Sequence, residues 1–547
     1  MSGRPFQPDD REPVDAAVAG FARAHAGLVE ARRDPLYLRA RYRAAGRRVG
    51  LVSGGGSGHE PLHAGFLGAG MLDAVAPGRV FASPDNRQVL EAGRAAAGPD
   101  GLLYVVKNYT GDRINFGIAA ERLRHEGVEV RRVLVDDDLA TDDDRTATGR
   151  RGTGATVAVE KLLGAAADRG LGLDELAELG GRVAAASRSL AVASRAHTAP
   201  DTGAPAFALG DGELEYGVGI HGERARTSIP RPGLSELVGR MVRELTAALP
   251  GTGGELLAIV NGLGATTNLE LYGVYDEVCR CLGERGLTVA GSLVGTYVAA
   301  LDMHGFSITL TRLERGWLDL WQAPVRTPAF PGGADVPVVP APEPRAAPSS
   351  TPAAAGTSGE PGGPDAAVLR RYAEAVEAAY ADLTDLDRRS GDGDFGDNLR
   401  GAMRAVVARL DAHPGEPALD AAASVFLDSV GGTSGPLYGL LFAELAAEGW
   451  RAGVGAGLAA VQRVGKADRG DRTMVDALAP AADVLAAPSG TLTAAARAAE
   501  EGAAATADRR ARRGRASYVG ERAVGAADPG ATGVALLLRC AATELEP

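Results

Sequence analysis

The chain has 547 residues, of which 45% are hydrophobic and 23% are charged, and its formal net charge is −12. This composition is typical of a globular protein and argues against global disorder, and no apolar run is long enough to cross a membrane. The acidic balance disfavours a general nucleic-acid binder, and the cysteines (Cys279, Cys281 and Cys540) are too few for a disulfide framework. We therefore expect a cytoplasmic protein with a small-molecule ligand and no nucleic-acid or membrane partner. The unusual feature is glycine, at 75 residues, about twice the ordinary share of ~7%.

One segment divides the chain. Residues 331–364 hold nine of the 31 prolines, together with Gly, Ser and Ala, a composition typical of an extended linker. We expect a ligand-binding α/β domain over 1–330, this linker over 331–364 and an all-α domain over 365–547.

The first domain alternates β-branched runs with helical patterns. The predicted strands are 47–52, 101–106, 128–135, 255–260 and 306–310, with an Ala- and Leu-rich helix over 154–170. This alternation predicts an α/β fold with a largely parallel or mixed sheet. After residue 365 the apolar residues Val368, Tyr372, Val376, Tyr380 and Leu383 recur every three or four positions, which predicts amphipathic helices, six to nine in all.

Three motifs in the first domain carry polar side chains at strand ends or in glycine-rich turns. SGGGSGHEP (53–61) follows a strand and delivers His59, KNYTGD (107–112) ends another with Lys107 and Asp112, and YGVGIHGE (216–223) surrounds His221 with glycine. Glycines let the backbone approach a ligand, and a neutral imidazole can add to a carbonyl carbon. The alternatives are a tight turn, a solvated ion pair and histidines with structural hydrogen bonds.

The second domain carries a carboxylate cluster, LTDLDRRSGDGDFGDNL (383–399). Clustered aspartates favour a hard cation such as Mg²⁺ or Ca²⁺, but an EF-hand is excluded because Met403 stands where its bidentate Glu should be. GGTSGPLYG (431–439), 465–480 and 514–531 are further glycine-bearing loops suited to phosphate. A helix end that frays into a polar turn is the alternative.

Together, SGGGSGHEP, KNYTGD, GIHGE, GDGD, GGTSG, GDRTM, GRASY-GER and DPGA closely resemble the single-chain, ATP-dependent dihydroxyacetone (glycerone) kinases, over the whole chain except the linker. The resemblance implies an α/β ketose-binding region of two subdomains and a nucleotide-binding barrel of antiparallel helices. It also implies a phosphotransferase with an alcohol acceptor, ATP with two Mg²⁺ ions, a role in glycerol metabolism and a homodimer.

The resemblance also implies roles for individual residues. His221 would hold the ketose as a hemiaminal, and His59 and Asp112 would be the acid/base pair. The expected substrate-binding residues are Gly56, Ser57, Gly58, His59, Lys107 and Asp112. The expected metal ligands are Asp387, Asp392 and Asp394. The expected nucleotide contacts are Phe395, Gly396, Asp397, Asn398, Thr433, Ser434, Gly465, Met474, Arg515, Asp528, Pro529 and Gly530.

The chain departs from the family pattern at Phe395, at Asp397, at Ala526, in RRGTGATV (150–157) and in GERARTSIP (222–230), directly after His221. These changes leave open whether the carbonyl substrate is dihydroxyacetone, erythrulose or glyceraldehyde. The same motifs are also compatible with an FAD-AMP lyase activity that forms cyclic FMN, or with a ligand-sensing regulator without catalysis. A phosphoprotein-dependent kinase is disfavoured because the nucleotide domain is fused.

Overall fold

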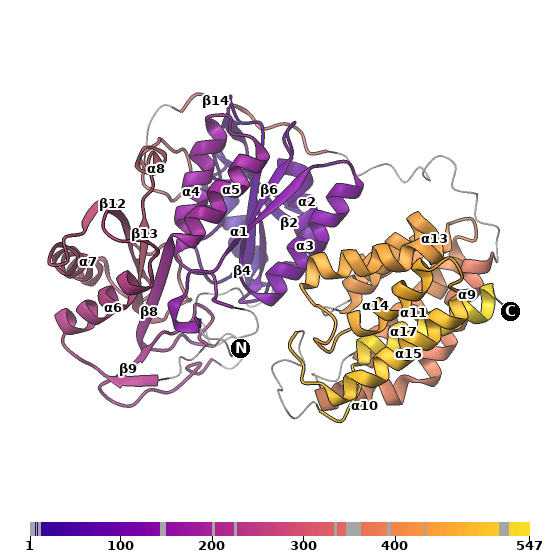
Figure 1. Ribbon diagram of the computed structural model, residues 1–547. Coiled ribbons are helices and arrows are strands. Elements are labelled where there is room, and N and C mark those ends of the chain that lie inside the picture. Colours follow the sequence, from indigo (N-terminus) through magenta and orange to yellow (C-terminus); the bar gives the residue numbers. More distant parts are fainter. Residues whose placement is uncertain are drawn as a thin grey trace. The chain divides into compact units, whose positions relative to one another are not determined.

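The structure is a computed structural model that describes residues 6, 8, 12–142, 149–199, 203–223, 227–332, 336–345, 363–390, 395–430, 434–513 and 524–546. The chain forms two compact units, Met1–Ala347 and Pro348–Pro547 (Figure 1). Their boundary falls inside segment 331–364. The first part of that segment packs within unit 1, because β14 (Val338–Pro340) pairs with β3 (Tyr42–Ala44).

Unit 1 contains two six-stranded sheets, in the orders β1-β2-β5-β4-β6-β7 and β10-β9-β8-β13-β11-β12. The strands of the first sheet are β1 (Val29–Arg33), β2 (Leu36–Ala40), β5 (Ala74–Val80), β4 (Gly50–Ser57), β6 (Leu102–Lys107) and β7 (Val130–Val135). The strands of the second are β10 (Thr227–Pro230), β9 (Glu213–Tyr216), β8 (Ser187–Arg195), β13 (His304–Arg312), β11 (Glu255–Gly262) and β12 (Thr288–Gly295). The helices are α1 (Pro13–Ala24), α2 (Asn86–Ala96), α3 (Thr110–His125), α4 (Ala155–Asp168), α5 (Leu173–Ala185), α6 (Leu234–Ala248), α7 (Asn268–Gly283) and α8 (Trp317–Trp321), with short 3₁₀ turns at Ala64–Phe66 and Leu139–Thr141.

The first sheet is covered by helices on both faces. Leu102, Tyr104 and Val106 of β6 share a core with α2 and α3, whereas Leu103 and Val105 share one with α4 and α5. This alternation explains why the strand is apolar at every position. The pairs β5–β4, β4–β6 and β6–β7 are parallel, so β4, β6 and β7 bring their carboxyl ends to one edge.

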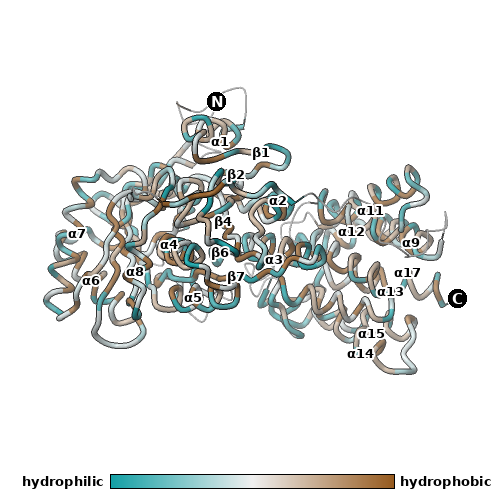
Figure 2. The backbone as a smooth tube through the Cα atoms, turned by 90° about the horizontal axis from the view of Figure 1, so that it is seen from above, coloured by the Kyte–Doolittle hydropathy of each residue, from teal (hydrophilic) through white to brown (hydrophobic). Residues whose placement is uncertain are grey.

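The second sheet is mainly antiparallel, and only β11–β12 pair in parallel. Helices α6 and α7 pack on one of its faces, with buried residues of α6 recurring every three or four positions, from Leu237 to Leu245. Hydrophilic and hydrophobic residues alternate along both helices in Figure 2. The prediction of an α/β region with two subdomains is confirmed.

Unit 2 is helical throughout its described part. Its helices are α9 (Pro364–Ala378), α10 (Tyr380–Ser390), α11 (Phe395–Ala412), α12 (Ala418–Ser429), α13 (Ser434–Gly465), α14 (Val475–Ala486), α15 (Leu492–Ala505) and α17 (Pro529–Leu545), with a 3₁₀ turn at Thr506–Asp508. A glycine at position 449, with φ of 72°, breaks α13 into two segments. The periodic residues Val368, Tyr372, Val376 and Leu383 are fully buried, as the pattern predicts, whereas Tyr380, at the start of α10, is only partly buried. The all-α prediction is confirmed.

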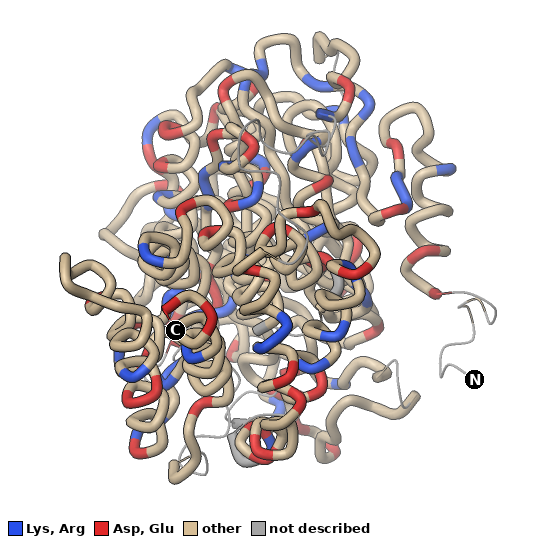
Figure 3. Tube along the Cα trace, turned by 90° about the vertical axis from the view of Figure 1, so that its right-hand side faces the viewer, with Lys and Arg blue, Asp and Glu red and all other residues tan. Residues whose placement is uncertain are grey.

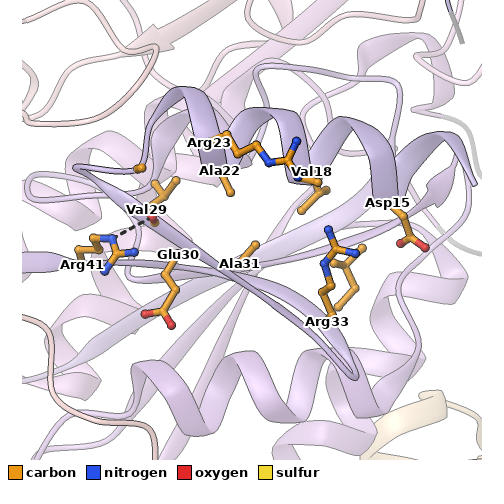
Figure 4. A pocket seen from close by; sticks show the side chains of 12 residues that line it. Asp15, Val18, Ala22, Arg23, Val29, Glu30, Ala31, Arg33 and Arg41 are labelled. Carbon is orange, nitrogen blue, oxygen red and sulfur yellow. Dashed lines mark hydrogen bonds between the residues drawn. The ribbon is translucent and has the colours of Figure 1, made fainter. Parts of the chain in front are cut away.

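Charged residues of both signs are interspersed over the face seen in Figure 3. In the described part of the chain, no helix is both long enough and apolar enough to cross a membrane. A pocket of about 340 Å³ lies between α1 and the β1–β2 hairpin, lined by Asp15, Arg23, Glu30, Arg33 and Arg41 among others (Figure 4). None of the predicted catalytic residues lines it.

Candidate active site

His59, Lys107 and Asp112 gather at the carboxyl edge of the first sheet. The neighbouring parallel strands β4 and β6 end in the glycine run before His59 and in Lys107, and Asp112 follows in the first turn of α3. All three residues are buried, with exposed fractions of 0%, 1% and 2% in that order. This edge is where α/β sheets usually bind ligands.

The second sheet contributes His221, shortly after β9. The ring of His221 lies 4.8 Å from the ring of His59 and 4.6 Å from that of Tyr109, centroid to centroid. Its side chain is 18% exposed, so it is more open than that of His59. The two sheets thus each contribute one histidine to the same site.

Glu223 fixes the orientation of His221. Its Oε1 lies 2.9 Å from Nδ1 of His221, and its Oε2 accepts the backbone N–H of His221 at 3.0 Å. Because a carboxylate only accepts, the His221 proton belongs on Nδ1, which leaves the lone pair of Nε2 available. Burial alone would raise the pKa of Glu223, but the hydrogen bond from His221, the positive charge that His221 carries when it is protonated, and the charge of Arg151 lower that pKa to about 2.

His59 has the opposite surroundings. Its Nδ1–H donates to the carbonyl oxygen of Ala299 at 2.8 Å, and its buried Nε2 has no hydrogen-bond partner among the described residues. Burial, together with the nearby His221 and Lys107, holds the pKa of His59 well below its usual value. A neutral imidazole with a vacant acceptor nitrogen can take up a proton from a bound hydroxyl group.

Asp112 is a buried carboxyl group beside a buried ammonium. Oδ1 of Asp112 lacks a hydrogen-bond partner within the described ranges, and burial raises the pKa of Asp112, against the lowering effects of Lys107 and the Ser83 hydroxyl. No hydrogen bond between Asp112 and His59 is recorded in those ranges. The two predicted acid/base residues thus each direct an unpartnered polar atom into the protein at the same edge of the sheet.

Glycine is required next to these groups. A Cβ at Gly55, where φ is +156°, would collide with Nζ of Lys107. A Cβ at Gly58, where φ is +101°, would lie 2.8 Å from the Phe81 ring. Ser57 directs its hydroxyl to the carbonyl oxygen of Gly78 at 2.7 Å. The run SGGGSG therefore lets a strand end pass close to Lys107, whereas the sequence predicts only a close approach of the backbone to a ligand.

In unit 2, four helix N-termini converge. Phe395 begins α11, and its ring centroid is 6.4 Å from that of Tyr438 in the first turns of α13. The Tyr438 hydroxyl donates to the carbonyl oxygen of Gly530, at the start of α17, at 2.8 Å. A Cβ on Gly530 would lie 3.6 Å from Cβ of Met474, which caps α14. Helix N-termini attract anions, so this end of the bundle suits phosphate groups.

Several described carboxylates lie at this end, among them Asp387, Asp528 and Asp476. Asp387 accepts the backbone N–H of Phe395 at 3.0 Å, and Asp528 caps α17 through the N–H of Ala531 at 2.8 Å. Burial raises the pKa of Asp528 to about 6, with contributions from Asp476 and Asp387. Mutually repelling carboxylates of this kind suit a divalent cation. The described residues hold no group of three or more potential metal ligands.

The remaining predicted nucleotide residues are only partly described. Gly396 and Asn398 lie in the first turn of α11, while Asp397 accepts hydrogen bonds from Tyr380 and Arg400 at 2.9 Å each. Gly465 ends α13, and Pro529 is the first residue of α17. The residues outside the described ranges, or with an undescribed side chain, are Asp392, Asp394, Thr433, Ser434 and Arg515.

Several residues of the first site had no role predicted from the sequence. Glu223 and Tyr109 contact His221, and His63 and Glu160 lie behind Lys107. A signal existed for Glu160, which together with Lys161 interrupts an apolar helical run, and for Glu223, which follows the histidine in GIHGE.

Comparisons with known proteins match both units of the chain. Residues 19–329 match the Dak1 domain, and residues 389–543 match the DAK2 domain. Human triokinase/FMN cyclase is 38% identical over 565 residues, covering 96% of both chains. L-erythrulose 1-kinase of Mycolicibacterium smegmatis is 37% identical, covering 89% of this chain and 90% of its own. The dihydroxyacetone kinase of C. freundii, in complex with AMP-PNP and Mg²⁺, superposes with a TM-score of 0.52 at 32% identity and 97% coverage of both chains.

Proposed function

Because the chain belongs to the family of single-chain, ATP-dependent dihydroxyacetone kinases, we propose that it transfers the γ-phosphoryl group of ATP to dihydroxyacetone or a related short-chain ketose or aldose. The enzyme is thus a phosphotransferase with an alcohol group as acceptor. The observation that carries this proposal is the pairing of His221 with Glu223, because it leaves Nε2 of His221 as a free nucleophile beside His59.

His221 captures the carbonyl group in this proposal. Its Nε2 adds to the carbonyl carbon, and the C=O bond becomes a C–O bond whose oxygen takes up a proton from solvent. The imidazole gives up its Nδ1 proton to solvent beside Glu223, so the hemiaminal forms with no net change in protons. The product is a hemiaminal, which orients the substrate and excludes polyols that lack a carbonyl group, such as glycerol.

His59 and Asp112 then act on the hydroxyl group that is phosphorylated. The hydroxyl oxygen bonds to the γ-phosphorus, the bond from that phosphorus to the bridging oxygen breaks, and ADP leaves. The hydroxyl proton passes to the vacant acceptor of His59 or of Asp112. Gly56, Ser57, Gly58 and Lys107 line the bound ketose.

The second unit would hold the nucleotide. The converging N-termini of α11, α13, α14 and α17 offer backbone donors to its phosphates. Asp387, with Asp392 and Asp394 from the sequence motif, would hold two Mg²⁺ ions, which neutralise phosphate charge when bound. The described carboxylates fit this role, because Asp476 and Asp387 lie close enough to Asp528 to add to the raising of its pKa by burial, and neighbouring carboxylates favour a cation.

Two relatives suggest substrates other than dihydroxyacetone, one for each site. The relative from M. smegmatis is an erythrulose kinase, and the altered segment after His221 lies beside the carbonyl-capturing residue. Phe395 and Asp397 distinguish the nucleotide end from the usual family pattern. The human relative is also named an FMN cyclase, so FAD is the second candidate substrate at the nucleotide site. We further expect a cytoplasmic homodimer.

The test is ADP release from ATP and Mg²⁺ with dihydroxyacetone, erythrulose, glyceraldehyde and glycerol in parallel. We expect turnover with a C3 or C4 carbonyl compound and none with glycerol. ADP release that no carbonyl compound stimulates would overturn the proposal. An FAD assay with Mg²⁺ or Mn²⁺ separates the cyclase activity from the kinase activity.

A further inference from the structure

A buried chain of polar groups continues from Lys107 to His63 and Glu160. Nζ of Lys107 lies 2.7 Å from Nε2 of His63, and Nδ1 of His63 lies 2.6 Å from Oε1 of Glu160. Ser53 Oγ lies 3.0 Å from the same Nδ1 and donates its own proton to the carbonyl oxygen of Val105. The exposed fractions of His63 and Glu160 are 4% and 0%. The proposed reaction gives neither residue a role.

The hydrogen-bond directions in this chain follow from its first member. An ammonium group only donates, so Nε2 of His63 accepts from Lys107 and the imidazole proton lies on Nδ1. That proton is donated to Glu160. Burial and the nearby charges of Lys107 and His59 hold the pKa of His63 well below its usual value, which agrees with a neutral ring.

Glu160 is a carboxyl group buried in the core of the first unit, where its ionised form is unfavourable. It belongs to α4, where every residue from Ala155 to Ala167 is buried. Its Oε2 has no hydrogen-bond partner in the part of the chain that is described, and burial raises the pKa of Glu160 to about 8, opposed by Ser53 and Lys107. An apolar side chain would usually be tolerated better in such a core. Packing alone therefore does not explain why a carboxyl group occupies this position.

We propose that His63 and Glu160 are positioning residues of the ketose site, which orient the Lys107 ammonium and hold it charged beside Asp112. This inference rests on the proposed function, because Lys107 is there a substrate-binding residue. Two of the three Lys107 N–H groups face Nε2 of His63 and the carbonyl oxygen of Gly54, the latter at 3.3 Å. The third is left for the substrate or for Asp112.

The charges around Lys107 determine whether loss of Glu160 raises or lowers the pKa of Lys107. Burial lowers the pKa of Lys107, and the carboxylates of Asp112 and Glu160 oppose that lowering. Among the described residues, His59 and His63 also titrate beside Lys107. Lys161, the next residue after Glu160, points elsewhere and donates to the carbonyl oxygen of Leu320 at 2.7 Å. Above about pH 8, where Glu160 is ionised, removing its charge must therefore lower the pKa of Lys107.

The first test measures the titration of the Lys107 side chain directly and does not depend on enzyme activity. The chain has three lysines, Lys107, Lys161 and Lys466, so ¹³Cε-lysine NMR of the full chain gives few signals to titrate. In Glu160→Gln, whose amide oxygen still accepts from His63, we expect the Lys107 titration to move to lower pH. Lys161→Met, which removes a buried charge one residue away, serves as the control and also assigns a signal. A Lys107 titration unchanged by Glu160→Gln would overturn the proposal.

The second test uses the pH profile of kcat/KM with ATP and the preferred ketose. In Glu160→Gln the alkaline limb of the kcat/KM profile should move to lower pH, so that kcat/KM falls roughly tenfold at pH values above the wild-type limb. A purely packing role for Glu160 would leave the limb at its wild-type pH. His63→Leu should lose activity because Lys107 loses an acceptor, and His63→Gln should restore much of it, since an amide can both accept and donate. A wild-type enzyme inactive on every ketose would refute the proposed function, and the NMR titration would still decide the coupling of Glu160 to Lys107.

Discussion

Oε1 of Glu223 lies 2.9 Å from Nδ1 of His221, two residues earlier in the chain. The contact is possible because the loop between them is almost free of side chains. A Cβ at Gly219 would collide with Glu223, and a Cβ at Gly222, where φ is +81°, would collide with His197. The glycine-rich motif therefore serves mainly to bring a carboxylate to the imidazole, and it leaves one nitrogen of His221 free.

Replacing Glu223 by Gln should impair carbonyl capture. The carboxylate determines which His221 nitrogen carries the proton and stabilises positive charge on the ring, whereas an amide can also turn and donate. We expect kcat/KM to fall roughly tenfold to a hundredfold, in line with the loss of one charged hydrogen bond. Steady-state kinetics with the preferred ketose measures this. An unchanged kcat/KM would show that Glu223 does not control His221.

The lowered pKa of Glu223 also predicts that the stability difference between wild type and Glu223→Gln depends on pH in the acid range. The pKa of Glu223 is lowered to about 2 from 4.5, despite the opposing effect of burial, so its stabilising contribution is present above pH 4.5 and is lost as the pH falls towards 2. The stability difference between wild type and Glu223→Gln should therefore shrink over that range. Thermal unfolding of both proteins between pH 3 and 7 gives the comparison, and a constant difference would contradict the ion pair.

Replacing His221 by Ala should abolish the covalent complex. In ¹³C NMR, dihydroxyacetone labelled at the carbonyl carbon should show a tetrahedral carbon when bound to the wild type and only its free forms with the variant. The exposed His413, in unit 2, provides a matched control as His413→Ala. If the tetrahedral signal survived in His221→Ala, another residue would be the nucleophile.

The sequence predicted what depends on local pattern. The strand runs at 101–106 and 128–135 became β6 and β7, and the periodic residues after 365 became buried helix faces, because apolar periodicity alone determines these elements. The placement of His59 and Lys107 at one edge followed from the rule that parallel strands end together.

The parts that could not be predicted depend on contacts between distant residues. His63 and Glu160 are 97 positions apart, and Lys107 and His63 are 44 apart, so no local spacing relates them. The second sheet is mainly antiparallel although its strands resemble those of the first, since pairing direction depends on how the chain returns rather than on strand composition. The tautomer of His221 likewise required the position of Glu223.

Gly55→Ala should displace Lys107 and reduce activity. The new Cβ would collide with the ammonium group, and it would also lie 3.6 Å from Oδ2 of Asp112. We expect a loss of kcat/KM of at least about tenfold with nucleotide binding unchanged, because nucleotide is expected on the other unit. Gly20→Ala in α1, where a Cβ meets nothing within 4 Å, is the control and should be neutral or slightly stabilising. Full activity of Gly55→Ala would mean that Lys107 can move without cost.

Asp112→Asn should separate binding from chemistry. Asparagine keeps the shape of the side chain, but its amide cannot accept a proton as a general base. We therefore expect kcat to fall by about 10²–10⁴ while ketose binding persists. In the wild type, burial raises the pKa of Asp112, so the acid limb of the pH profile should lie above the usual aspartate range. Loss of that limb in Asp112→Asn, with residual activity, would support the assignment. A variant with wild-type kcat would reject Asp112 as the base.

Asp528→Asn tests the nucleotide end of unit 2. Burial raises the pKa of Asp528 to about 6 from 3.8, with further raising by Asp476 and Asp387, so the free protein loses stability as the pH rises from 3.8 to about 6 and keeps that loss above it. Asparagine can still cap α17 through its carbonyl oxygen, so the nucleotide-free variant should be more thermostable than wild type at pH 7 and similar to it near pH 4. Its affinity for AMP-PNP with Mg²⁺, measured by calorimetry, should fall at least about tenfold while dihydroxyacetone binding is retained. Unaltered nucleotide affinity would remove Asp528 from the nucleotide site, and equal loss of ketose binding would indicate general misfolding.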